Sequence, residues 1–365
     1  MSDTSPFGRF FLPGPTEVRP EVAAAQARPM IGHRGPEMEA LLARIQPTLQ
    51  DLFRTRRPVY VATASATGLM EGAIRNGART RVLSLVNGAF SLRFHQIALA
   101  CGLEAEKLEV PMGDGHTPEM LHEALRRGGF DTVTVVHSET STGVLNPIAE
   151  LTRVAHAAGD VAVLVDSVSG IGGAPVETDL WELDVVLTGS QKALALPPGL
   201  SFAVARESVL ARAADNSSRG IYFDFLEFEK GAKKHQTPNT PAISLFYALD
   251  AQLERLREET VEGRWARHHA MAHRTWAWVD EMADRGLGLR MLAPETFRSP
   301  TVSCIRLPDG RTGPDVAHAL AVRGYTIAPG YGALRDSTIR IGHMGDHTVD
   351  ELEALLAELA ESLDS

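Results

Sequence analysis

The sequence predicts an α/β protein in which a large domain with a mostly parallel sheet precedes a small C-terminal α+β domain. Between residues 59 and 205, short runs rich in β-branched residues alternate with segments of helical length. These runs are apolar almost throughout, which is typical of parallel strands that are buried on both faces. After residue 240 the pattern changes to a long helical stretch and then to a second, smaller set of strands.

The strands expected in the large sheet follow directly from these apolar runs. They cover Val59–Thr63, Arg81–Val86, Thr132–His137, Val161–Asp166 and Val185–Thr188. Pro118–Arg127 and Glu150–Ala158 have the length and pattern of crossover helices. The run Ser201–Ala205 follows Pro197-Pro198-Gly199 too closely for a helical crossover, so we expect this strand to be antiparallel to its neighbour.

The C-terminal third predicts helices and a few strands. Residues from Ala242 to about Ala283 have the spacing of one long or broken helix. Thr301–Leu307 and Thr338–Ile341 are the expected strands of the small unit. The last helix begins at a capping box of Thr348 and Glu351. Its apolar stripe consists of Leu352, Leu355, Leu356, Leu359 and Leu363.

Composition excludes several classes of protein. The chain has 365 residues and a net charge of −10, and its basic residues form no stripe, which argues against a nucleic-acid partner. Its two cysteines, Cys101 and Cys304, lie far apart, as in a protein of a reducing compartment. No signal pattern opens the sequence, and no apolar run reaches the roughly 20 residues that span a membrane. We therefore expect a cytoplasmic protein with no membrane association.

Chemically versatile side chains follow several of the predicted strands. Asp166 ends one strand, Lys192 follows another, and Ser65-Ala66-Thr67 opens the helical segment Gly68–Arg75. Thr140 follows the strand that ends near His137. In an open parallel sheet, ligands bind beyond the carboxyl ends of the strands, so these groups are expected to converge.

This combination meets the needs of a pyridine cofactor that acts as an electron sink. Such a cofactor requires a carboxylate at its ring nitrogen and a lysine amine for a Schiff base. Its phosphate binds backbone N–H groups at the start of a helix. An isolated aspartate or lysine carries little weight, because most such residues cap turns or lie at the surface. Together, however, Asp166, Lys192 and Ser65–Thr67 indicate pyridoxal 5′-phosphate (PLP).

These motifs resemble those of the class V aminotransferases of PLP fold type I. The resemblance rests on Ser190-Gln191-Lys192-Ala193-Leu194 with Val165-Asp166-Ser167-Val168-Ser169 upstream, and it extends from Leu12 to Gly342. It is most marked toward the alanine–glyoxylate and serine–glyoxylate (serine–pyruvate) aminotransferases. It implies a mostly parallel seven-stranded sheet in the large domain. It also implies an N-terminal arm over residues 1–20, a large PLP-binding domain over 21–260 and a small domain over 261–365.

The resemblance implies a role for each residue of a cofactor site. Lys192 would form the Schiff base and later shuttle a proton between the substrate Cα and the cofactor, while Asp166 would hold the pyridine nitrogen. Val168 and Phe90 would pack against the ring, and Thr140 would lie near the ring oxygen. The phosphate contacts are implied at Ser65, Ala66, Thr67 and Gln191.

Further residues are implied at the substrate and at a subunit interface. Gln236 and Thr237 match a stretch that reaches the phosphate of a neighbouring subunit, which implies a homodimer with shared active sites. Arg340 matches an arginine that grips the substrate carboxylate, and Gly14 is placed beside it at the substrate.

The function implied is a two-stage transfer of an amino group from alanine or serine to glyoxylate or pyruvate. A second hypothesis keeps the cofactor but takes phosphoserine or 2-aminoethylphosphonate as donor, with Arg34 as the extra cation. A third is a PLP-binding protein without catalysis, in which Arg340 would have no task.

Two other kinds of site are disfavoured. Gly170-Ile171-Gly172-Gly173 lacks the spacing of a dinucleotide-binding loop. His268, His269 and His273 lack the glutamate of a helical zinc site, so we expect no metal and interpret them as a solvated helix face.

Overall fold

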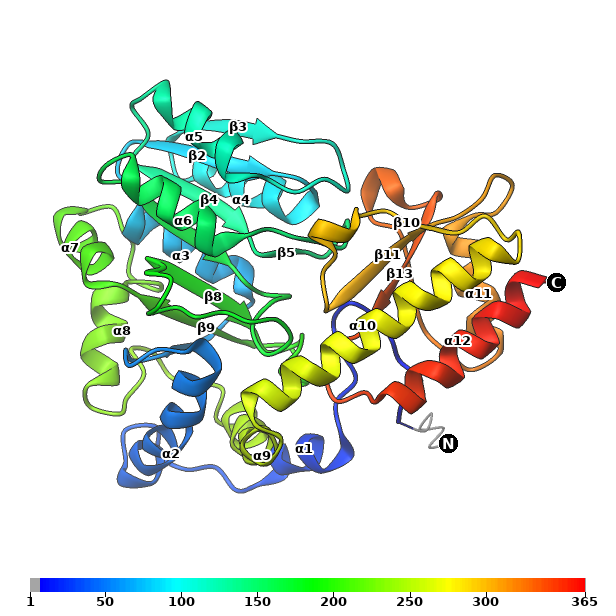
Figure 1. The fold of residues 1–365 in the computed structure, drawn as a ribbon. Coiled ribbons are helices and arrows are strands. Elements are labelled where there is room, and N and C mark those ends of the chain that lie inside the picture. The colour runs from blue at the N-terminus through cyan, green and yellow to red at the C-terminus, as the bar shows by residue number, and fades with distance from the viewer. Residues whose placement is uncertain (1–6, 365) are drawn as a thin grey trace.

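The structure is a computed structural model that describes residues 7–364. It contains a large sheet, a small sheet and a two-stranded sheet of β5 (Ser138–Glu139) and β6 (Val144–Leu145). Figure 1 shows the large sheet and its helices on one side of the molecule and the small sheet with its own helices on the other. The long helix α10 (Val261–Asp284) runs from the first part toward the second. The predicted domain limits at residues 20 and 260 stay predictions, and residues 1–6 of the predicted arm lie outside the described range.

The large sheet has seven strands in the order β1-β9-β8-β7-β4-β2-β3, which confirms the predicted fold class. Five of them, β2, β3, β4, β7 and β8, are parallel, whereas β9 is antiparallel to both β8 and β1, as its short connection predicts. Their bounds are β1 Tyr60–Thr63, β2 Arg81–Val86, β3 Glu104–Glu109, β4 Thr132–Val136, β7 Ala162–Asp166, β8 Val185–Gly189 and β9 Leu200–Ala205.

Helices cover both faces of this sheet. One face packs on α2 (Pro36–Phe53), α5 (Pro118–Arg126), α6 (Ile148–Ala157) and α9 (Ile243–Glu259), which share one apolar core with the strands. The other face packs on α3 (Ala66–Gly77), α4 (Ala89–Ala100), α7 (Glu207–Asp215) and α8 (Phe225–Ala232). Because both faces are covered, the strands are apolar almost throughout and could be recognised from the sequence.

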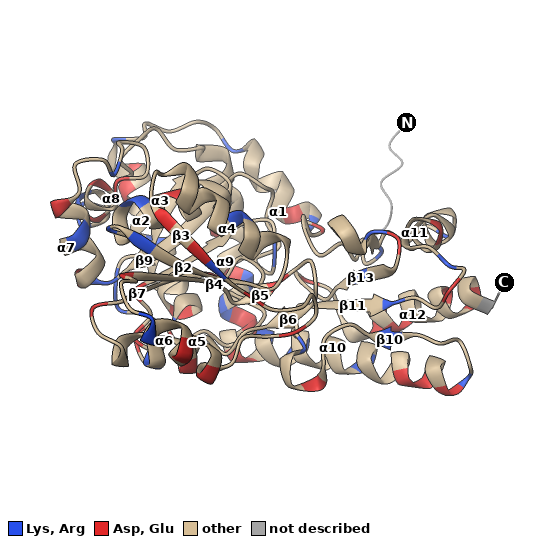
Figure 2. Cartoon of the chain, turned by 90° about the horizontal axis from the view of Figure 1, so that it is seen from above, with Lys and Arg blue, Asp and Glu red and all other residues tan. Residues whose placement is uncertain are grey.

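The edge strand β3 is one element that the sequence did not predict. Its six residues, Glu104 to Glu109, include three glutamates and a lysine, and most of their side chains are exposed or half-buried. An edge strand has only one neighbour, here β2, so it can carry charges that a central strand cannot. Figure 2 shows these acidic and basic residues along β3.

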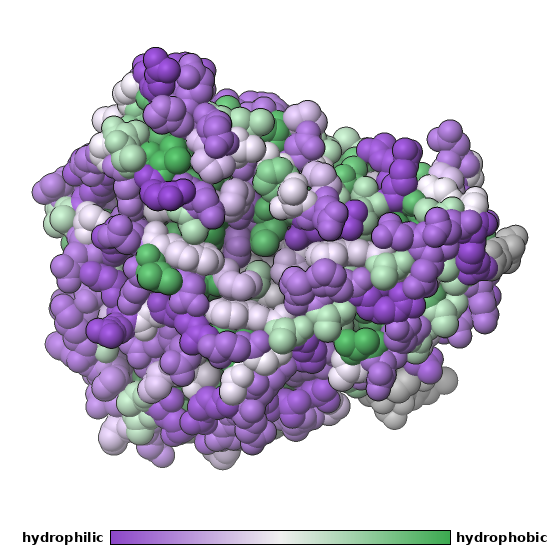
Figure 3. Space-filling view, in the orientation of Figure 1, coloured by the Kyte–Doolittle hydropathy of each residue, from purple (hydrophilic) through white to green (hydrophobic). Residues whose placement is uncertain are grey.

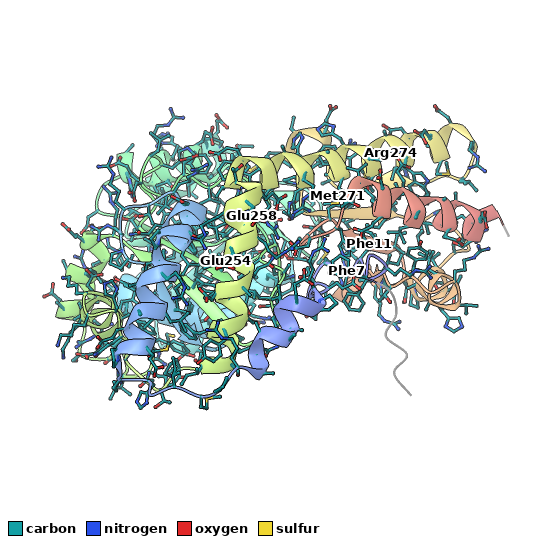
Figure 4. All side chains as sticks on the ribbon, turned by 90° about the horizontal axis from the view of Figure 1, so that it is seen from below. Phe7, Phe11, Glu254, Glu258, Met271 and Arg274 are labelled. Atoms are coloured by element: carbon teal, nitrogen blue, oxygen red, sulfur yellow. The ribbon has the colours of Figure 1, made fainter. Side chains whose placement is uncertain are left out.

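The second sheet is antiparallel and has the order β10-β11-β13-β12. Its strands are β10 Arg290–Met291, β11 Val302–Arg306, β12 Ala328–Pro329 and β13 Thr338–Gly342, and it packs with α10, α11 (Gly313–Val322) and α12 (Val349–Asp364). Phe11 and Met271, both labelled in Figure 4, are fully buried in this core. The N-terminal segment therefore joins the small sheet, and Phe10 also pairs with Thr326.

The helices predicted in the C-terminal third are confirmed. The predicted stretch 242–283 is a broken helix, because Thr260 has φ +67° and separates α9 from α10. The capping box of α12 is formed as predicted: Thr348 N donates to Glu351 Oε2, and Glu351 N donates to Thr348 Oγ1. The apolar stripe of α12 is buried.

The prediction for one of the three α10 histidines is wrong. His269 and His273 are exposed, but His268 is fully buried, and its Nδ1 lies 2.8 Å from the carbonyl oxygen of Arg264. The ring contacts the turn at Gly173, where an added Cβ would lie 3.1 Å from it. Among residues 7–364, no group of three or more His, Cys, Asp or Glu side chains is arranged to hold a metal ion.

The surface of the viewed face is mostly hydrophilic, with small, separated apolar patches (Figure 3). None of the helices within residues 7–364 combines the length and the apolar character that a membrane span requires.

Candidate active site

A cavity lies at the carboxyl ends of the large sheet's strands. Nine of the residues expected from the sequence line it together: Ser65, Ala66, Thr67, Phe90, Thr140, Asp166, Val168, Gln191 and Lys192. They come from the loops after β1, β2, β4, β7 and β8. The edge of the sheet thus gathers side chains that are up to 127 positions apart in the chain, from Ser65 to Lys192.

Lys192 lies in the turn after β8 and is almost fully buried. Its Nζ donates a hydrogen bond to the carbonyl oxygen of Pro13 and lies 5.9 Å from the centre of the Phe90 ring. The N-terminal segment crosses directly over this amine. At Gly14 (φ +115°) an added Cβ would lie 2.5 Å from Nζ, so only glycine fits there. Gly14 is therefore next to the lysine in this structure.

The pKa of Lys192 is lowered to about 7. Burial of the amine is the largest cause, and the positive charge of Arg340 acts in the same direction. The carboxylates of Asp166 and Glu139 oppose this shift and raise the pKa. A lysine with such a pKa is partly deprotonated at neutral pH, so it can accept a proton.

Asp166 ends β7, is buried and lines the cavity. Its Oδ1 accepts a hydrogen bond of 2.8 Å from the backbone N–H of Val168. Its Oδ2 accepts none from any residue within 7–364. Burial raises the pKa of this carboxyl to about 7, although the Val168 N–H and the charge of Lys192 lower it. A buried carboxylate with a free oxygen is suited to bind a protonated ring nitrogen.

The first turn of α3 presents unoccupied backbone donors. The first N–H groups of a helix have no partner inside the helix, and Ser65 at the N-cap makes no capping hydrogen bond with its side chain. Ala66 and Thr67 follow at the wall of the cavity. The helix has 12 residues and no acidic residue in its first turn, so its positive end favours an anion.

Phe90 is held at the start of α4 by a buried carboxylate. Glu139 accepts hydrogen bonds from the backbone N–H groups of Phe90 and Ser91, at 3.2 and 2.9 Å. It also accepts from the hydroxyls of Ser91 and Ser141. This carboxylate caps α4 from a different loop and fixes the backbone that carries the Phe90 ring. The sequence reasoning missed this role, because the contact joins residues 49 positions apart.

Arg340 and Thr140 meet at the side of the cavity that faces the small sheet. Arg340, on β13, donates from Nη1 to the carbonyl oxygen of Thr140 (3.2 Å) and from Nε to that of Pro329 (3.1 Å). Its Nη2 has no hydrogen-bond partner within the described range. The Thr140 hydroxyl lies 2.5 Å from that of Ser169. Tyr331 lies between Phe90 and Arg340. Its ring centre is 5.5 Å from that of Phe90 and 5.5 Å from the Arg340 guanidinium.

Two predicted residues lie away from the Lys192 cavity of their own chain. Gln236 donates to Glu39, and the hydroxyl of Thr237 donates to the carbonyl of Asn239. Both line a surface hollow beside β1, the edge strand of the large sheet. Arg34 donates to the carbonyls of Thr237 and Pro238, so it supports this stretch and does not line the cavity.

Arg93 is a cavity residue that the sequence reasoning missed. It lies one turn after Phe90 on α4, with its guanidinium 5.1 Å from the Phe90 ring centre. It forms no hydrogen bond or ion pair with any residue of 7–364. Its position three residues after the predicted aromatic was the available signal, because residues i and i+3 share a helix face. The remaining unpredicted wall residues are Met70, Val136, Ser138 and Ser169.

Comparison with known sequences assigns a family model to most of the chain. The model for aminotransferase class-V matches residues 63–355. An uncharacterized aminotransferase of Methanocaldococcus jannaschii is 38% identical over 352 residues, covering 95% of this chain and 90% of that protein. The L-aspartate–glyoxylate aminotransferase of Paracoccus denitrificans is 35% identical (93% and 86% covered). The serine–glyoxylate aminotransferase of Methylorubrum extorquens is 32% identical (94% and 88%).

Solved structures with the same fold cover nearly the whole chain. An aspartate aminotransferase of subgroup IV from Thermus thermophilus has a TM-score of 0.88 and 32% identity, covering 98% of this chain and 99% of its own. The alanine–glyoxylate aminotransferase of Nostoc sp. has a TM-score of 0.91 and 26% identity, covering 100% and 97%. The similarity thus extends over both the large and the small sheet.

Proposed function

This chain belongs to the class-V aminotransferase family, which is PLP-dependent, and we propose that it transfers the amino group of alanine or serine to glyoxylate or pyruvate. The observation that carries the proposal is the cavity that Asp166 and Lys192 line together, in which burial and the nearby charge of Arg340 lower the pKa of Lys192 to about 7. Glyoxylate as acceptor is further supported by the names of three similar proteins, whose donors are aspartate, serine and alanine.

The residues of the cavity fit PLP. The free N–H groups at Ser65–Thr67 suit its phosphate, and the free Oδ2 of Asp166 suits its ring nitrogen. Phe90 and Val168 supply apolar contacts, and Lys192 supplies the amine that anchors it. When bound, PLP supplies an electron sink that makes the Cα proton of an amino acid removable.

Arg340 and Lys192 have separate roles: Arg340 binds the substrate carboxylate, and Lys192 moves the Cα proton. The free Nη2 of Arg340, with its fixed neighbour Nη1, would bind the substrate carboxylate as a charge-assisted pair. That grip would orient the substrate so that Lys192 can reach its Cα proton. Nζ of Lys192 takes the Cα proton, which requires the neutral amine, and its lowered pKa provides that form near pH 7.

The chain also limits access of water to the lysine. Pro13 and Gly14 lie against Nζ on one side, and the Phe90 ring lies on another. Exclusion of water strengthens the electrostatic interactions in the cavity. The donor leaves as a 2-oxo acid before the acceptor enters, so the two substrates use the same Arg340 in turn.

The assembly that we propose is a homodimer with shared active sites. Gln236 and Thr237 belong to a stretch at the edge of the large sheet that does not reach its own Lys192 cavity. In an isologous pair, the same stretch of the partner would complete the phosphate site. A monomer with full activity at all concentrations would contradict this part of the proposal.

The test is a half-reaction followed by visible absorbance. The PLP-loaded protein is mixed with alanine or serine, and glyoxylate or pyruvate is added afterwards. We expect the donor to bleach the visible band and the acceptor to restore it. The control is Arg340→Met, for which the donor concentration at half-maximal rate should rise at least about tenfold, since a charge-assisted pair is lost. A protein that no amino acid bleaches would contradict the proposal.

A second candidate is a donor with an additional acidic group, such as aspartate or phosphoserine. Arg93 favours it, because this cation lies in the cavity without an ion-pair partner in the part of the chain described. The names of two similar proteins, an L-aspartate–glyoxylate and an aspartate aminotransferase, add support for aspartate. Arg34, proposed from the sequence for phosphoserine, is occupied by backbone carbonyls.

The two candidates are separated by the variants Arg93→Met and Arg93→Lys. If Arg93 binds a second acidic group, kcat/KM for aspartate or phosphoserine falls at least about tenfold in Arg93→Met and partly recovers in Arg93→Lys, while alanine is little affected. Equal losses for alanine and aspartate would exclude this role.

A further inference from the structure

The turn that carries Lys192 is held through three consecutive backbone carbonyl groups. Thr16 donates its backbone N–H to the carbonyl of Gln191 (2.9 Å) and its hydroxyl to that of Lys192 (2.9 Å). The third carbonyl, of Ala193, accepts from the guanidinium of Arg264. Ala195, two residues on, has φ +53°, a conformation that alanine seldom adopts. This turn is therefore fixed by residues from outside the large sheet.

Arg264 is placed at the corner between the two long helices. Figure 4 shows α9 and α10 meeting just past the labelled Glu258, and Arg264 is the fourth residue of α10. Its side chain is 2% exposed. Both Nε (3.1 Å) and Nη2 donate to the same Ala193 carbonyl, while Nη1 donates to Glu259 at 2.7 Å. Two donors on one carbonyl fix both its direction and its distance from the helix.

The same guanidinium also reaches the segment that follows the substrate-binding strand. Nη2 of Arg264 lies 2.9 Å from Oδ1 of Asp346, which is 5% exposed. Asp346 comes six residues after Arg340, just beyond β13. Gln252 of α9 and Arg19 of the N-terminal segment also bind Asp346. One buried cation thus contacts both the lysine turn and the chain segment that leads from Arg340.

We propose that Arg264 is a positioning residue that sets the geometry between Lys192 and Arg340. The proposal rests on the function proposed above, in which these two residues share one substrate. Arg264 does not line the cavity. It acts by fixing the Ala193 carbonyl relative to Asp346, so the amine and the guanidinium keep one separation. Displacements of about 1 Å in such an arrangement can cost about a hundredfold in rate.

Arg267 offers a matched control on the same helix. It binds the same Glu259, and it donates to the carbonyls of Gly345 and His347, on either side of Asp346. It makes no hydrogen bond to the turn of residues 191–195. Loss of Arg267 should therefore weaken the same junction without loosening Lys192.

The test compares Arg264→Lys and Arg264→Gln with Arg267→Lys and Arg267→Gln in the PLP-loaded protein. The first readout is the midpoint of a pH titration of the visible absorbance without any amino acid, which reports the surroundings of the Lys192 nitrogen. We expect both Arg264 variants to move it by about half a unit or more and both Arg267 variants to leave it unchanged. In the half-reaction, kcat of the Arg264 variants should fall about tenfold or more, with KM changed less than about threefold.

The contrary results are equally defined. Arg264 variants that keep the titration midpoint and kcat while losing thermal stability would show a purely structural residue, and equal shifts in the Arg267 variants would show that the whole junction acts. Should neither Arg264 variant fold, Asp346→Asn loosens Arg264 from outside the turn. It should move the midpoint in the same readout, and an unmoved midpoint overturns the proposal. If the wild-type protein transfers no amino group, the titration still reports on Lys192, so the two failures remain distinct.

Discussion

Both ends of the large sheet carry charged residues, but the charged residues at the two ends differ in how many hydrogen-bond partners they have. At the amino ends, Asp131, Asp160 and Asp184 stand directly before or near the starts of β4, β7 and β8. At the carboxyl ends of the same strands lie Asp166 and Lys192 in the cavity. The pKa values of Asp131 and Asp160 are lowered by their hydrogen-bond partners, whereas burial raises the pKa of Asp166 and lowers that of Lys192.

At the amino-terminal edge, charged side chains are paired with several hydrogen-bond partners each. Asp131 accepts hydrogen bonds from the backbone N–H groups of Arg79, Thr80 and Arg81. Burial raises its pKa, but these hydrogen bonds outweigh burial, so the net pKa is below the ordinary value. Arg212, 4% exposed, donates to the carbonyls of Gly77, Asp131 and Asp160 and thereby ties three loops together.

The comparison teaches that burial alone does not decide what a charge does. The pKa values of two aspartates of one sheet shift in opposite directions, because Asp131 is only partly buried and has several donors, whereas Asp166 is fully buried and has one. Unpaired buried charges lower stability, so a chain that keeps them at one edge keeps them for chemistry. The following experiments test this division, beginning with the largest expected effect.

Replacement of Lys192 by methionine should remove activity and spare the fold. We expect the rate of the half-reaction with any donor to fall at least about a thousandfold, since the residue that moves the proton is lost. Circular dichroism should remain unchanged. Exposed Lys107, paired with Glu109 on β3, is the matched control, and Lys107→Met should behave as wild type. A Lys192→Met protein that retains a tenth of the activity would contradict the assignment.

Replacement of Arg212 by methionine should lower the stability of the fold and leave the activity nearly unchanged. Three backbone carbonyls lose a hydrogen bond from a buried guanidinium, so the free energy of unfolding should fall by about 2–4 kcal/mol in urea denaturation. The kcat of the folded protein should stay within about twofold, because Arg212 lies at the end of the sheet opposite the cavity. A large loss of kcat in the folded variant would break the division between the two edges.

The pair Asp131→Asn and Asp166→Asn gives a sharper comparison through pH. The folded pKa of Asp131 is lowered, so its stabilisation exists above the ordinary pKa and disappears as pH falls. The folded pKa of Asp166 is raised from 3.8 to about 7, so its cost is absent below pH 4 and complete above pH 7. At pH 7.5, Asp131→Asn should therefore destabilise the PLP-free protein and Asp166→Asn should stabilise it, each by about 1–3 kcal/mol.

Urea denaturation between pH 4 and pH 8 measures both effects. An Asp166→Asn protein that is less stable than the wild type at pH 7.5 would contradict the unpaired state of Asp166, and an Asp131→Asn protein that is more stable would contradict the stabilising role of the Asp131 hydrogen bonds.

The smallest effect is expected at the solvent-exposed rim of the amino-terminal edge. Arg79 pairs with Asp160, and both side chains are about half exposed or more. Arg79→Ala should change the free energy of unfolding by less than about 1 kcal/mol, since water and ions screen such pairs. A loss as large as that of Arg212→Met would show that exposure does not separate the two arginines.

The sequence was most informative where a structural feature depends on residues that are close together in the chain. Apolar runs predicted most parallel strands of the large sheet, and the capping box of Thr348 and Glu351 predicted the start of α12. The nine cavity residues follow strand ends or match motifs, so they were predicted together. Strand β3 was missed because an exposed edge tolerates the charges of Glu104 to Glu109.

What the sequence could not supply were contacts between distant segments. Glu139 caps α4, Arg264 holds Ala193, and Arg93 points to the cavity without a local motif. His268 was misjudged for the same reason, since its burial depends on a turn near Gly173 that lies about 95 positions away. Charged and polar residues are exposed by default, and only tertiary packing reveals the exceptions.

The most direct measurement is the location of PLP on the chain. The loaded protein is reduced with borohydride, digested and analysed by mass spectrometry, which finds the lysine that carries the pyridoxyl group. The sequence has only five lysines, at positions 107, 192, 230, 233 and 234, so the result is unambiguous. We expect the label on Lys192 alone. A label on any of the other four, or no label in a protein that binds PLP, would contradict the site at the carboxyl edge of the sheet.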